Sequence, residues 1–315
     1  MNRQADNMNS NDSKKFRSGF VTLAGRPNVG KSTLMNRILG EKVAIVSPKP
    51  QTTRNRLLGI KHVDDRGQIV FIDTPGIHKA QGRLNRQMVE YAYDAMNDAD
   101  ILVLMIDAIK TDLNRGMSPV DVQILGRLAK LDKPIFLIIN KVDKVKKTEL
   151  LPFLDKVKDL HPFAAIFPIS ALRGVGADDV VEALLERLPE GSELFPKDQI
   201  TDLTMRFLAA EVIREKILLF CHEEIPYSVA IEIERFLEMD DGKRVHIDAA
   251  VFVERDSQKG IIIGKGGQML TRIGSEARKD LEKMFDMKVG LKLFIKEERN
   301  WTENPYSLRR FGYGK

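Results

Sequence analysis

The sequence contains one cysteine and no long apolar run. Cys221 cannot form a disulfide within the chain, so nothing indicates an oxidising compartment. A membrane-spanning helix needs about 18 or more consecutive apolar residues, and no such run is present. Residues 1–16 are polar and lack the apolar core of a secretory signal, which predicts a disordered tail. These absences favour a cytoplasmic protein without a transmembrane segment.

Length and composition predict a globular protein of two domains. A chain of 315 residues is too long for one ordinary core. Its net charge of +5 is compatible with an anionic partner but does not require one. Polar, proline-containing sequence from Pro189 to about Asp198 marks a boundary. We therefore expect a first domain over 17–190, a linker over 191–200, a second domain over 201–300 and a C-terminal tail over 301–315.

Residues 25–32 match the phosphate-binding pattern G-x-x-x-x-G-K-[ST] without a mismatch. An accidental match is expected in about one in a hundred chains of this length. The apolar run 20–24 before it and the helical spacing of 34–39 after it supply the strand and helix that the pattern needs. A glycine-rich turn without a ligand is the alternative. The pattern predicts that a nucleoside triphosphate binds to Gly25, Arg26, Pro27, Asn28, Val29, Gly30, Lys31 and Ser32, with Lys31 on the β- and γ-phosphates and Ser32 on Mg²⁺.

A second motif follows the β-hairpin predicted for residues 57–72. Its residues are Asp73, Thr74, Pro75 and Gly76, directly after the apolar run 69–72. An acidic side chain at the tip of a strand beside the phosphate loop is where Mg²⁺ is expected. Gly76 allows a backbone N–H to approach the γ-phosphate.

A third motif, Asn140, Lys141, Val142 and Asp143, follows the predicted strand 134–139. A carboxylate at Asp143 accepts two hydrogen bonds from guanine, whereas adenine offers no such pair of donors. Each charge-assisted bond contributes about 1.5–3 kcal/mol, which suffices to select GTP over ATP. A solvated turn is the alternative for this motif alone. The segment Ser170, Ala171 and Leu172 follows the next strand, and a backbone N–H near Ala171 is predicted to meet the guanine oxygen.

Strands alternate with helices through the first domain. Strands are predicted at 101–106, 134–139 and 165–169, and helices at about 84–96, 120–131 and 180–188. This alternation predicts an α/β fold with a mostly parallel, doubly wound sheet, whose ligands bind at the carboxyl ends of the strands.

The second domain has a different pattern, which predicts a smaller α+β fold. A helix is expected over 201–220, alternating strands over 228–236 and 245–253, a helix after residues 264–267, and a last strand over 289–295. The order of elements around the G-x-x-G at 264–267 resembles the bacterial type II KH domain, whose loop clamps a nucleic-acid backbone. The resemblance implies RNA contacts at Gly264, Lys265, Gly266, Gly267 and Arg272. A solvated helix face is the alternative for Arg272, Arg278 and Lys279.

The C-terminal tail mixes aromatic and basic side chains. Aromatics interleaved with cations suit stacking on unpaired bases. Burial that pins the C-terminus to the domain is the alternative, above all for Trp301. The residues concerned are Trp301, Tyr306, Phe311 and Tyr313, with Arg309, Arg310 and Lys315.

The first domain resembles the translation-factor-related GTPases. The resemblance implies Ser32 and Thr53 as direct Mg²⁺ ligands and Asp73 as a ligand through water, with Thr52 as the alternative to Thr53. Ras-like enzymes place a glutamine just after D-x-x-G, but Ile77 stands here and cannot orient water, so slow intrinsic hydrolysis is expected. His78 is adjacent, and a structural or solvated role is the alternative to one on water. We expect Asn28, Lys31, Thr53 and Gly76 to support hydrolysis, with K⁺ bound through Asn28 as a further ion.

The order of the two domains is similar to the architecture of the Era GTPases. The resemblance rests on residues 25–32, 51–54, 73–76, 140–143, 170–172 and 264–267 and covers nearly all of the chain beyond the N-terminal tail. It implies a monomeric GTP/GDP switch with Mg²⁺ that binds the 3′ end of 16S rRNA and acts in assembly of the small ribosomal subunit. It also implies peripheral association with the inner membrane. The alternatives are a membrane-surface adaptor that links nucleotide state to cell growth, and a KH fold that docks proteins only.

Overall fold

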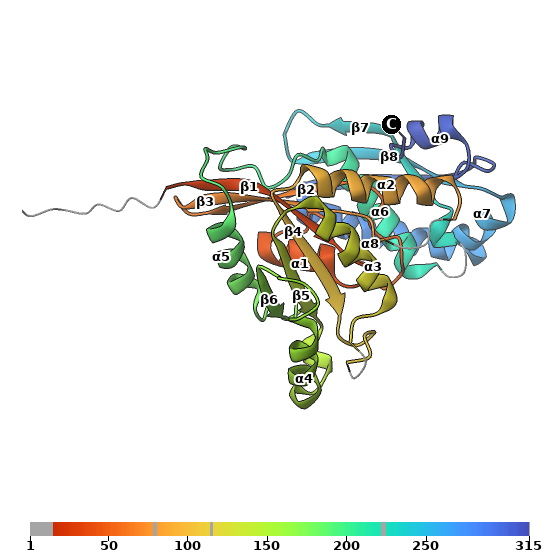
Figure 1. Ribbon diagram of the computed structural model, residues 1–315. Coiled ribbons are helices and arrows are strands. Elements are labelled where there is room, and N and C mark those ends of the chain that lie inside the picture. The colour runs from red at the N-terminus through yellow and green to blue at the C-terminus, as the bar shows by residue number, and fades with distance from the viewer. Residues whose placement is uncertain (1–14, 78–80, 114–115, 222–224, 315) are drawn as a thin grey trace, which may run out of the picture.

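The computed structural model describes residues 15–77, 81–113, 116–221 and 225–314, which form two domains (Figure 1). The first domain has a six-stranded sheet in the order β2-β3-β1-β4-β5-β6, with β2 antiparallel to β3 and the other neighbouring pairs parallel. Its strands are β1 (Arg17–Ala24), β2 (Leu57–Val63), β3 (Gly67–Asp73), β4 (Ile101–Asp107), β5 (Ile135–Asn140) and β6 (Ala165–Pro168). The predicted hairpin and doubly wound sheet are confirmed.

Helices cover both faces of this sheet. The inner strands β3, β4 and β5 are buried along their whole length, as expected of parallel strands that are apolar on both sides. Buried residues of α1 and α5 pack on one face, and those of α2, α3 and α4 on the other. The helices are α1 (Lys31–Leu39), α2 (Arg83–Asp98), α3 (Pro119–Leu128), α4 (Lys147–Val157) and α5 (Ala177–Arg187). Helix α4, with Pro152 inside it, was not among the predicted helices.

The second domain has a three-stranded sheet in the order β7-β8-β9. Strand β8 is antiparallel to β7 and parallel to β9. Helices α6 and α8 pack on one face of this sheet, which confirms the predicted α+β arrangement. The elements are α6 (Met205–Phe220), β7 (Ala230–Glu238), β8 (Arg244–Val253), α7 (Asp256–Ile263), α8 (Gln268–Phe285), β9 (Lys288–Glu297) and α9 (Pro305–Arg310). Short 3₁₀ turns lie at Ala129–Leu131, Val142–Lys144, Ile225–Tyr227 and Lys265–Gly267.

The C-terminal segment packs on the other face of the second sheet. Trp301 is fully buried, and its ring meets Phe311 edge-on at 5.4 Å and stacks on Tyr313 at 5.8 Å. The indole N–H donates to the Ser228 carbonyl oxygen at 2.8 Å. Of the two interpretations of the tail, burial against the domain is therefore confirmed for Trp301, Phe311 and Tyr313, and stacking on RNA bases is not, because a buried ring has no face to offer. Tyr306 is exposed, and Lys315 lies outside the described residues.

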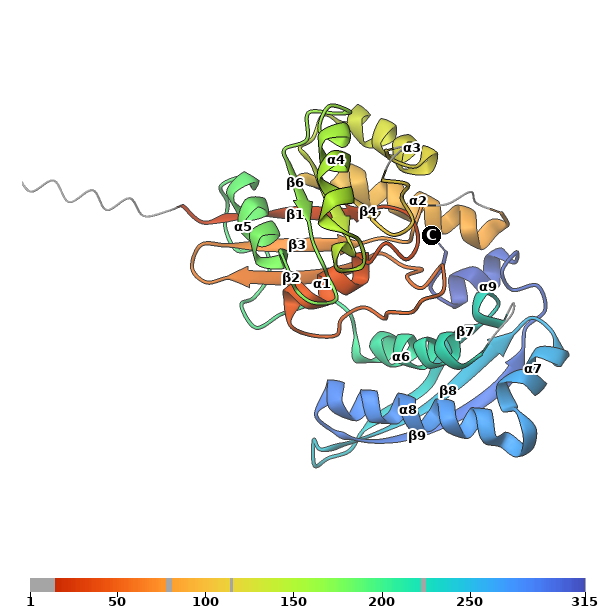
Figure 2. The ribbon, with the colours of Figure 1, turned by 90° about the horizontal axis from the view of Figure 1, so that it is seen from below.

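The two domains share an interface. Leu84 and Met88 of α2 belong to the same apolar cluster as Phe252 and the C-terminal aromatic rings. The residues between α5 and α6 run along the edge strand β2, where the Ile60 N–H donates to the Ile200 carbonyl oxygen at 2.8 Å. Figure 2 shows α6 between the first domain and the second sheet. Among the described residues, no helix has the length and apolar character needed to cross a membrane.

Candidate functional site

The phosphate loop joins β1 to α1, as the sequence predicts. Gly30 caps the N-terminus of α1, which places the positive end of the helix at the loop. Lys31 is buried, and its Nζ lies 3.5 Å from the Gly25 carbonyl oxygen and 3.4 Å from that of Arg26. Burial lowers the pKa of the Lys31 ammonium, while Asp73 acts in the opposite direction. A phosphate group would supply the negative charge that this ammonium otherwise lacks.

Three oxygen-bearing side chains meet beside Lys31. The Ser32 hydroxyl donates to Asp73 Oδ2 at 2.5 Å, and the Thr53 hydroxyl donates to the same atom at 3.1 Å. The two hydroxyl oxygens are 3.0 Å apart. Asp73 Oδ1 is buried and has no hydrogen-bond partner among the described residues. Burial raises the pKa of the Asp73 carboxyl, while Lys31 and the two hydroxyls act to lower it. Hydroxyl and carboxylate oxygens are ligands that Mg²⁺ prefers, so the cluster fits that ion.

The structure separates the two neighbouring threonines. Thr53 is buried and faces Ser32 and Asp73. Thr52 instead places its hydroxyl 2.9 Å from that of Ser47 and donates to the Lys49 carbonyl oxygen at 2.8 Å. Of the two, Thr53 is therefore the one in reach of the predicted metal site.

The Asp73 to Gly76 motif holds the end of β3 against the phosphate loop. The Thr74 hydroxyl donates to the Leu23 carbonyl oxygen at 2.8 Å, so its side chain joins β3 to β1. A Cβ at Gly76 would lie 2.6 Å from the Pro27 backbone, so only glycine fits this approach. Ile77 is buried, and its N–H donates to the Gly25 carbonyl oxygen at 3.0 Å. The predicted role of His78 falls outside the described residues.

Asn140 and Lys141 bind the phosphate loop to the guanine motif. The Asn140 side chain donates to the Val29 carbonyl oxygen at 2.7 Å and accepts from the Ala171 N–H at 2.9 Å. The predicted contact of a backbone N–H near Ala171 with the guanine oxygen stays a prediction; in this structure the Ala171 N–H itself donates to Asn140. Lys141 Nζ donates to the Asn28 carbonyl oxygen at 2.8 Å and to Asp107 at 2.6 Å, so β4 contributes a carboxylate that orients it.

Asp143 lies beside Ser170 at the edge of the same pocket. The Ser170 hydroxyl donates to Asp143 Oδ1 at 2.7 Å, and Arg173 lies 3.6 Å from Oδ2. The Ser170 hydrogen bond is the largest of the effects on the pKa of Asp143, which is lowered from its usual value. The side chain is 8 % exposed. Asp143 is therefore an ionised acceptor that is largely screened from water, as selection of guanine requires.

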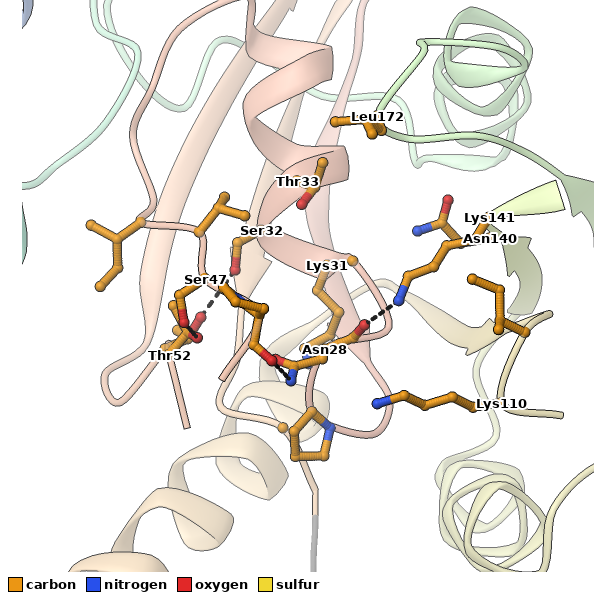
Figure 3. Close-up of a pocket in the computed structure, with 18 of the residues that line it drawn as sticks. Asn28, Lys31, Ser32, Thr33, Ser47, Thr52, Lys110, Asn140, Lys141 and Leu172 are labelled. Atoms are coloured by element: carbon orange, nitrogen blue, oxygen red, sulfur yellow. Dashed lines mark hydrogen bonds between the residues drawn. The ribbon is translucent and has the colours of Figure 1, made fainter. Parts of the chain in front are cut away.

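These residues line one pocket of about 510 Å³ (Figure 3). The ammonium groups of Lys110 and Lys141 point toward the phosphate loop from the same side. Lining residues that the motifs did not identify are Thr33, Ile45, Val46, Ser47, Pro48, Ile109, Lys110 and Lys144. Lys110 could have been predicted from the sequence, because it follows Asp107 at the end of a predicted strand. Residues 45–51 show no hydrophobic periodicity from which their position could be predicted. That position depends on hydrogen bonds to the second domain.

The predicted RNA loop lies on the second domain, between α7 and α8. Gly264 has φ of +71°, and a Cβ there would lie 2.7 Å from the Met269 Cβ, so glycine is required. Lys265 is exposed at the loop tip. The Arg272 guanidinium lies 4.2 Å from the centre of the Phe220 ring, and Lys279 pairs with Glu276 at 2.6 Å. The side chain of Arg272, a residue of α8, thus packs against Phe220 of α6, and Lys279 belongs to a solvated helix face.

Two family descriptions match the two domains. Residues 20–141 match the family described as a 50S ribosome-binding GTPase, and residues 224–302 match the KH domain. Curated relatives match over nearly the whole chain. GTPase Era of Syntrophus aciditrophicus is 49 % identical over 95 % of this chain and 96 % of its own length. GTPase Era of Geobacter metallireducens is 50 % identical over 95 % of this chain and 98 % of its own length.

Solved structures give the same result. A variant of Aquifex aeolicus Era bound to GDP·AlF₄⁻ has a TM-score of 0.90 and 42 % identity, over 95 % of this chain and all of that chain. A crystal structure of Era with MgGDPNP and nucleotides 1506–1542 of 16S ribosomal RNA has the same TM-score, identity and coverage. Both domains and their order are therefore shared along the full length of these proteins. The chain belongs to the Era family of GTPases.

Proposed function

We propose that this GTPase is an RNA-binding switch that acts in assembly of the small ribosomal subunit and in 16S rRNA maturation, by binding the 3′ end of 16S rRNA. The Era structure that contains an rRNA fragment supports the choice of RNA, because its fold is shared over 95 % of this chain. The observation that carries the nucleotide half of the proposal is the convergence of Ser32, Thr53 and Asp73 beside Lys31.

Each residue of the cluster has a proposed role. Ser32 and Thr53 would hold Mg²⁺ directly and Asp73 would hold it through water, while Lys31 would stabilise charge on the β- and γ-phosphates. The bound Mg²⁺ would offset negative charge on the phosphates during transfer. The Gly76 backbone packs closely against Pro27 and borders the part of the pocket where the γ-phosphate is expected. Loss of GTP hydrolysis in Thr53→Ala, with GDP still bound, is the expected result. Unchanged hydrolysis would contradict the assignment.

Water positioning needs a different solution from that of Ras-like enzymes. The Ile77 side chain is buried in the core, so it presents no polar group to water. We extend the proposal to K⁺ bound through Asn28. This residue has φ of +64°, and its amide nitrogen donates at 2.6 Å to the Pro48 carbonyl oxygen, in the segment that carries Thr53. Faster hydrolysis in K⁺ than in Na⁺, abolished by Asn28→Ala, is expected. Equal rates in the two salts would rule out this role.

The proposed RNA site is the loop of Gly264, Lys265, Gly266 and Gly267, with Arg272 at its border. Cross-linking of the GTP-bound protein to cellular RNA, followed by sequencing, should recover the 3′ end of 16S rRNA. The doubly substituted Gly264→Asp, Lys265→Asp protein should lose this RNA and keep GTP binding. Equal binding of the wild-type protein to any polyanion would instead favour the alternative of a membrane-surface adaptor. That alternative, the monomeric state and the cytoplasmic location all stay predictions.

A further inference from the structure

The segment that carries Thr53 is bound by the second domain on both sides of that residue. Before it, the Val46 N–H donates to Glu215 Oε1 of α6 at 2.9 Å, and Lys49 Nζ donates to the Cys221 carbonyl oxygen. Figure 2 shows the chain after α1 running alongside α6. The nucleotide pocket therefore has one wall whose position depends on the KH domain.

Arg54 follows Thr53 directly and is buried in the second domain. Its guanidinium donates to the Val229 carbonyl oxygen at 2.7 Å and to that of Tyr227 at 3.1 Å. It also lies 5.8 Å from the centre of the Trp301 ring and 5.5 Å from that of Tyr313. Only 1 % of the residue is exposed. A planar guanidinium held by two carbonyls and two rings fixes the backbone that carries it.

Arg214 of α6 holds the other side of Thr53. Its guanidinium donates to the Thr52 carbonyl oxygen. Glu211, one turn earlier on α6, accepts from the same guanidinium at 2.7 Å and 2.6 Å. This bidentate pair leaves Arg214 little freedom, and the residue is 1 % exposed. The peptide before Thr53 is therefore attached to a side chain of the KH domain.

We infer that Arg54 and Arg214 are positioning residues for the GTPase reaction, through which the KH domain holds Thr53 at the magnesium site. The inference rests on the proposed role of Thr53 as a ligand. Neither arginine touches the nucleotide pocket, so each acts through the backbone on one side of Thr53. Because such coupling is reciprocal, binding of Mg²⁺ at this site must also change the environment of Arg54. Trp301 is the only tryptophan in the chain and reports on that environment.

The test compares full-length Arg214→Lys and a Glu211→Met, Arg214→Met protein with the wild type. The double variant removes both charges of a buried pair, so that neither is left unpaired. We expect kcat for GTP to fall about 10–100-fold, the effect of a small misplacement of a catalytic group, while KM changes little. Arg206→Gln is the matched control, since this exposed arginine of α6 donates to the Ile233 carbonyl oxygen and lies over the Phe236 ring, both in the second domain.

Tryptophan emission gives a readout that does not depend on turnover. Titration of Mg²⁺ into wild-type protein with a non-hydrolysable GTP analogue should change Trp301 emission. The Mg²⁺ concentration at half of that change should rise about tenfold or more in the double variant, with partial rescue by lysine in Arg214→Lys. An emission insensitive to Mg²⁺, identical titrations, or equal loss of kcat in Arg206→Gln would overturn the inference. If Thr53→Ala abolishes hydrolysis while these variants hydrolyse GTP at the wild-type rate, the inference fails and the proposed function stands. If Thr53→Ala is fully active, the proposed function fails as well.

Discussion

The nucleotide pocket and the G-x-x-G loop both depend on glycine, but their polar groups are held in different ways. In the pocket, Asn140 and Lys141 are bonded to the phosphate loop, and Ser32 and Thr53 are bonded to Asp73. At the RNA loop, Lys265 is exposed, and a Cβ at Gly266 or Gly267 would meet no described atom within 4 Å. One site is assembled in advance, and the other is an open backbone with one cation.

The difference predicts different kinds of specificity. A preformed pocket with fixed acceptors discriminates between ligands by leaving buried groups unpaired when the wrong ligand binds. An exposed loop follows a phosphate backbone and leaves the choice of bases to neighbouring surfaces. Substitutions in the pocket should therefore cost more affinity than substitutions at the loop.

The largest expected effect is that of Asp143→Ala on nucleotide affinity. Two charge-assisted hydrogen bonds to guanine are lost, each about 1.5–3 kcal/mol, so GTP affinity should fall by about two to four decades. Isothermal titration calorimetry with GTP measures it. Asp155→Ala is the matched control, because Asp155 is an exposed carboxylate that pairs with the exposed Lys158. An affinity for GTP within a few-fold of the wild type would show that the guanine site is not preformed.

The motif residues were predictable because a parallel sheet brings its strand tips to one edge. Asp73, Asp107 and Asn140 are the last residues of β3, β4 and β5, and all three have contacts at the pocket. Each of these residues follows an apolar run that only a buried strand explains, so the sequence itself predicts the placement.

The contacts between the domains were not predictable in the same way. Arg54 and Arg214 look like ordinary charged residues in the sequence, and their burial depends on a surface that lies more than a hundred residues away in the chain. The role of the C-terminal aromatic side chains could not be predicted for a related reason. Rings interleaved with cations fit both RNA stacking and core packing, and only Phe252 and the neighbouring sheet decide between them.

A second prediction concerns the effect of the preformed cluster of Ser32, Thr53 and Asp73 on the stability of the nucleotide-free protein. Burial raises the folded-state pKa of Asp73 above its unfolded value. Between the two values the folded state binds more protons, so stability falls as pH rises through that window. At pH values above the folded-state pKa, the full destabilisation by the buried carboxylate remains. Asp73→Asn should remove this pH dependence and, because it removes the buried charge, stabilise nucleotide-free protein at neutral pH by about 1–3 kcal/mol.

Thermal unfolding in EDTA at a series of pH values tests the prediction for Asp73. Asp107→Asn is the comparison, because the Asp107 carboxylate is buried but accepts from Lys141 and from the Ile109 N–H. That variant should be destabilised where Asp73→Asn is stabilised. Equal destabilisation of both proteins would mean that the Ser32 and Thr53 hydroxyls already satisfy Asp73.

The smallest expected effects lie at the RNA loop, where Lys265→Ala and Arg272→Ala should differ. Lys265 is an exposed cation at the loop tip, and removing one phosphate contact should weaken RNA binding a few-fold and reduce the slope of log affinity against log salt by about 1. The Arg272 guanidinium already lies on the Phe220 ring, so its removal should change affinity by about twofold and leave that slope nearly unchanged. Fluorescence anisotropy with a 3′-end 16S rRNA oligonucleotide between 50 and 200 mM salt, the range over which such contacts are resolved, measures both quantities. A larger salt effect for Arg272 than for Lys265 would move the RNA backbone from the open loop to the surface of α8 where Arg272 lies beside Phe220. The RNA site would then resemble the nucleotide pocket, since its cation would be held in place by a neighbouring helix before the ligand arrives.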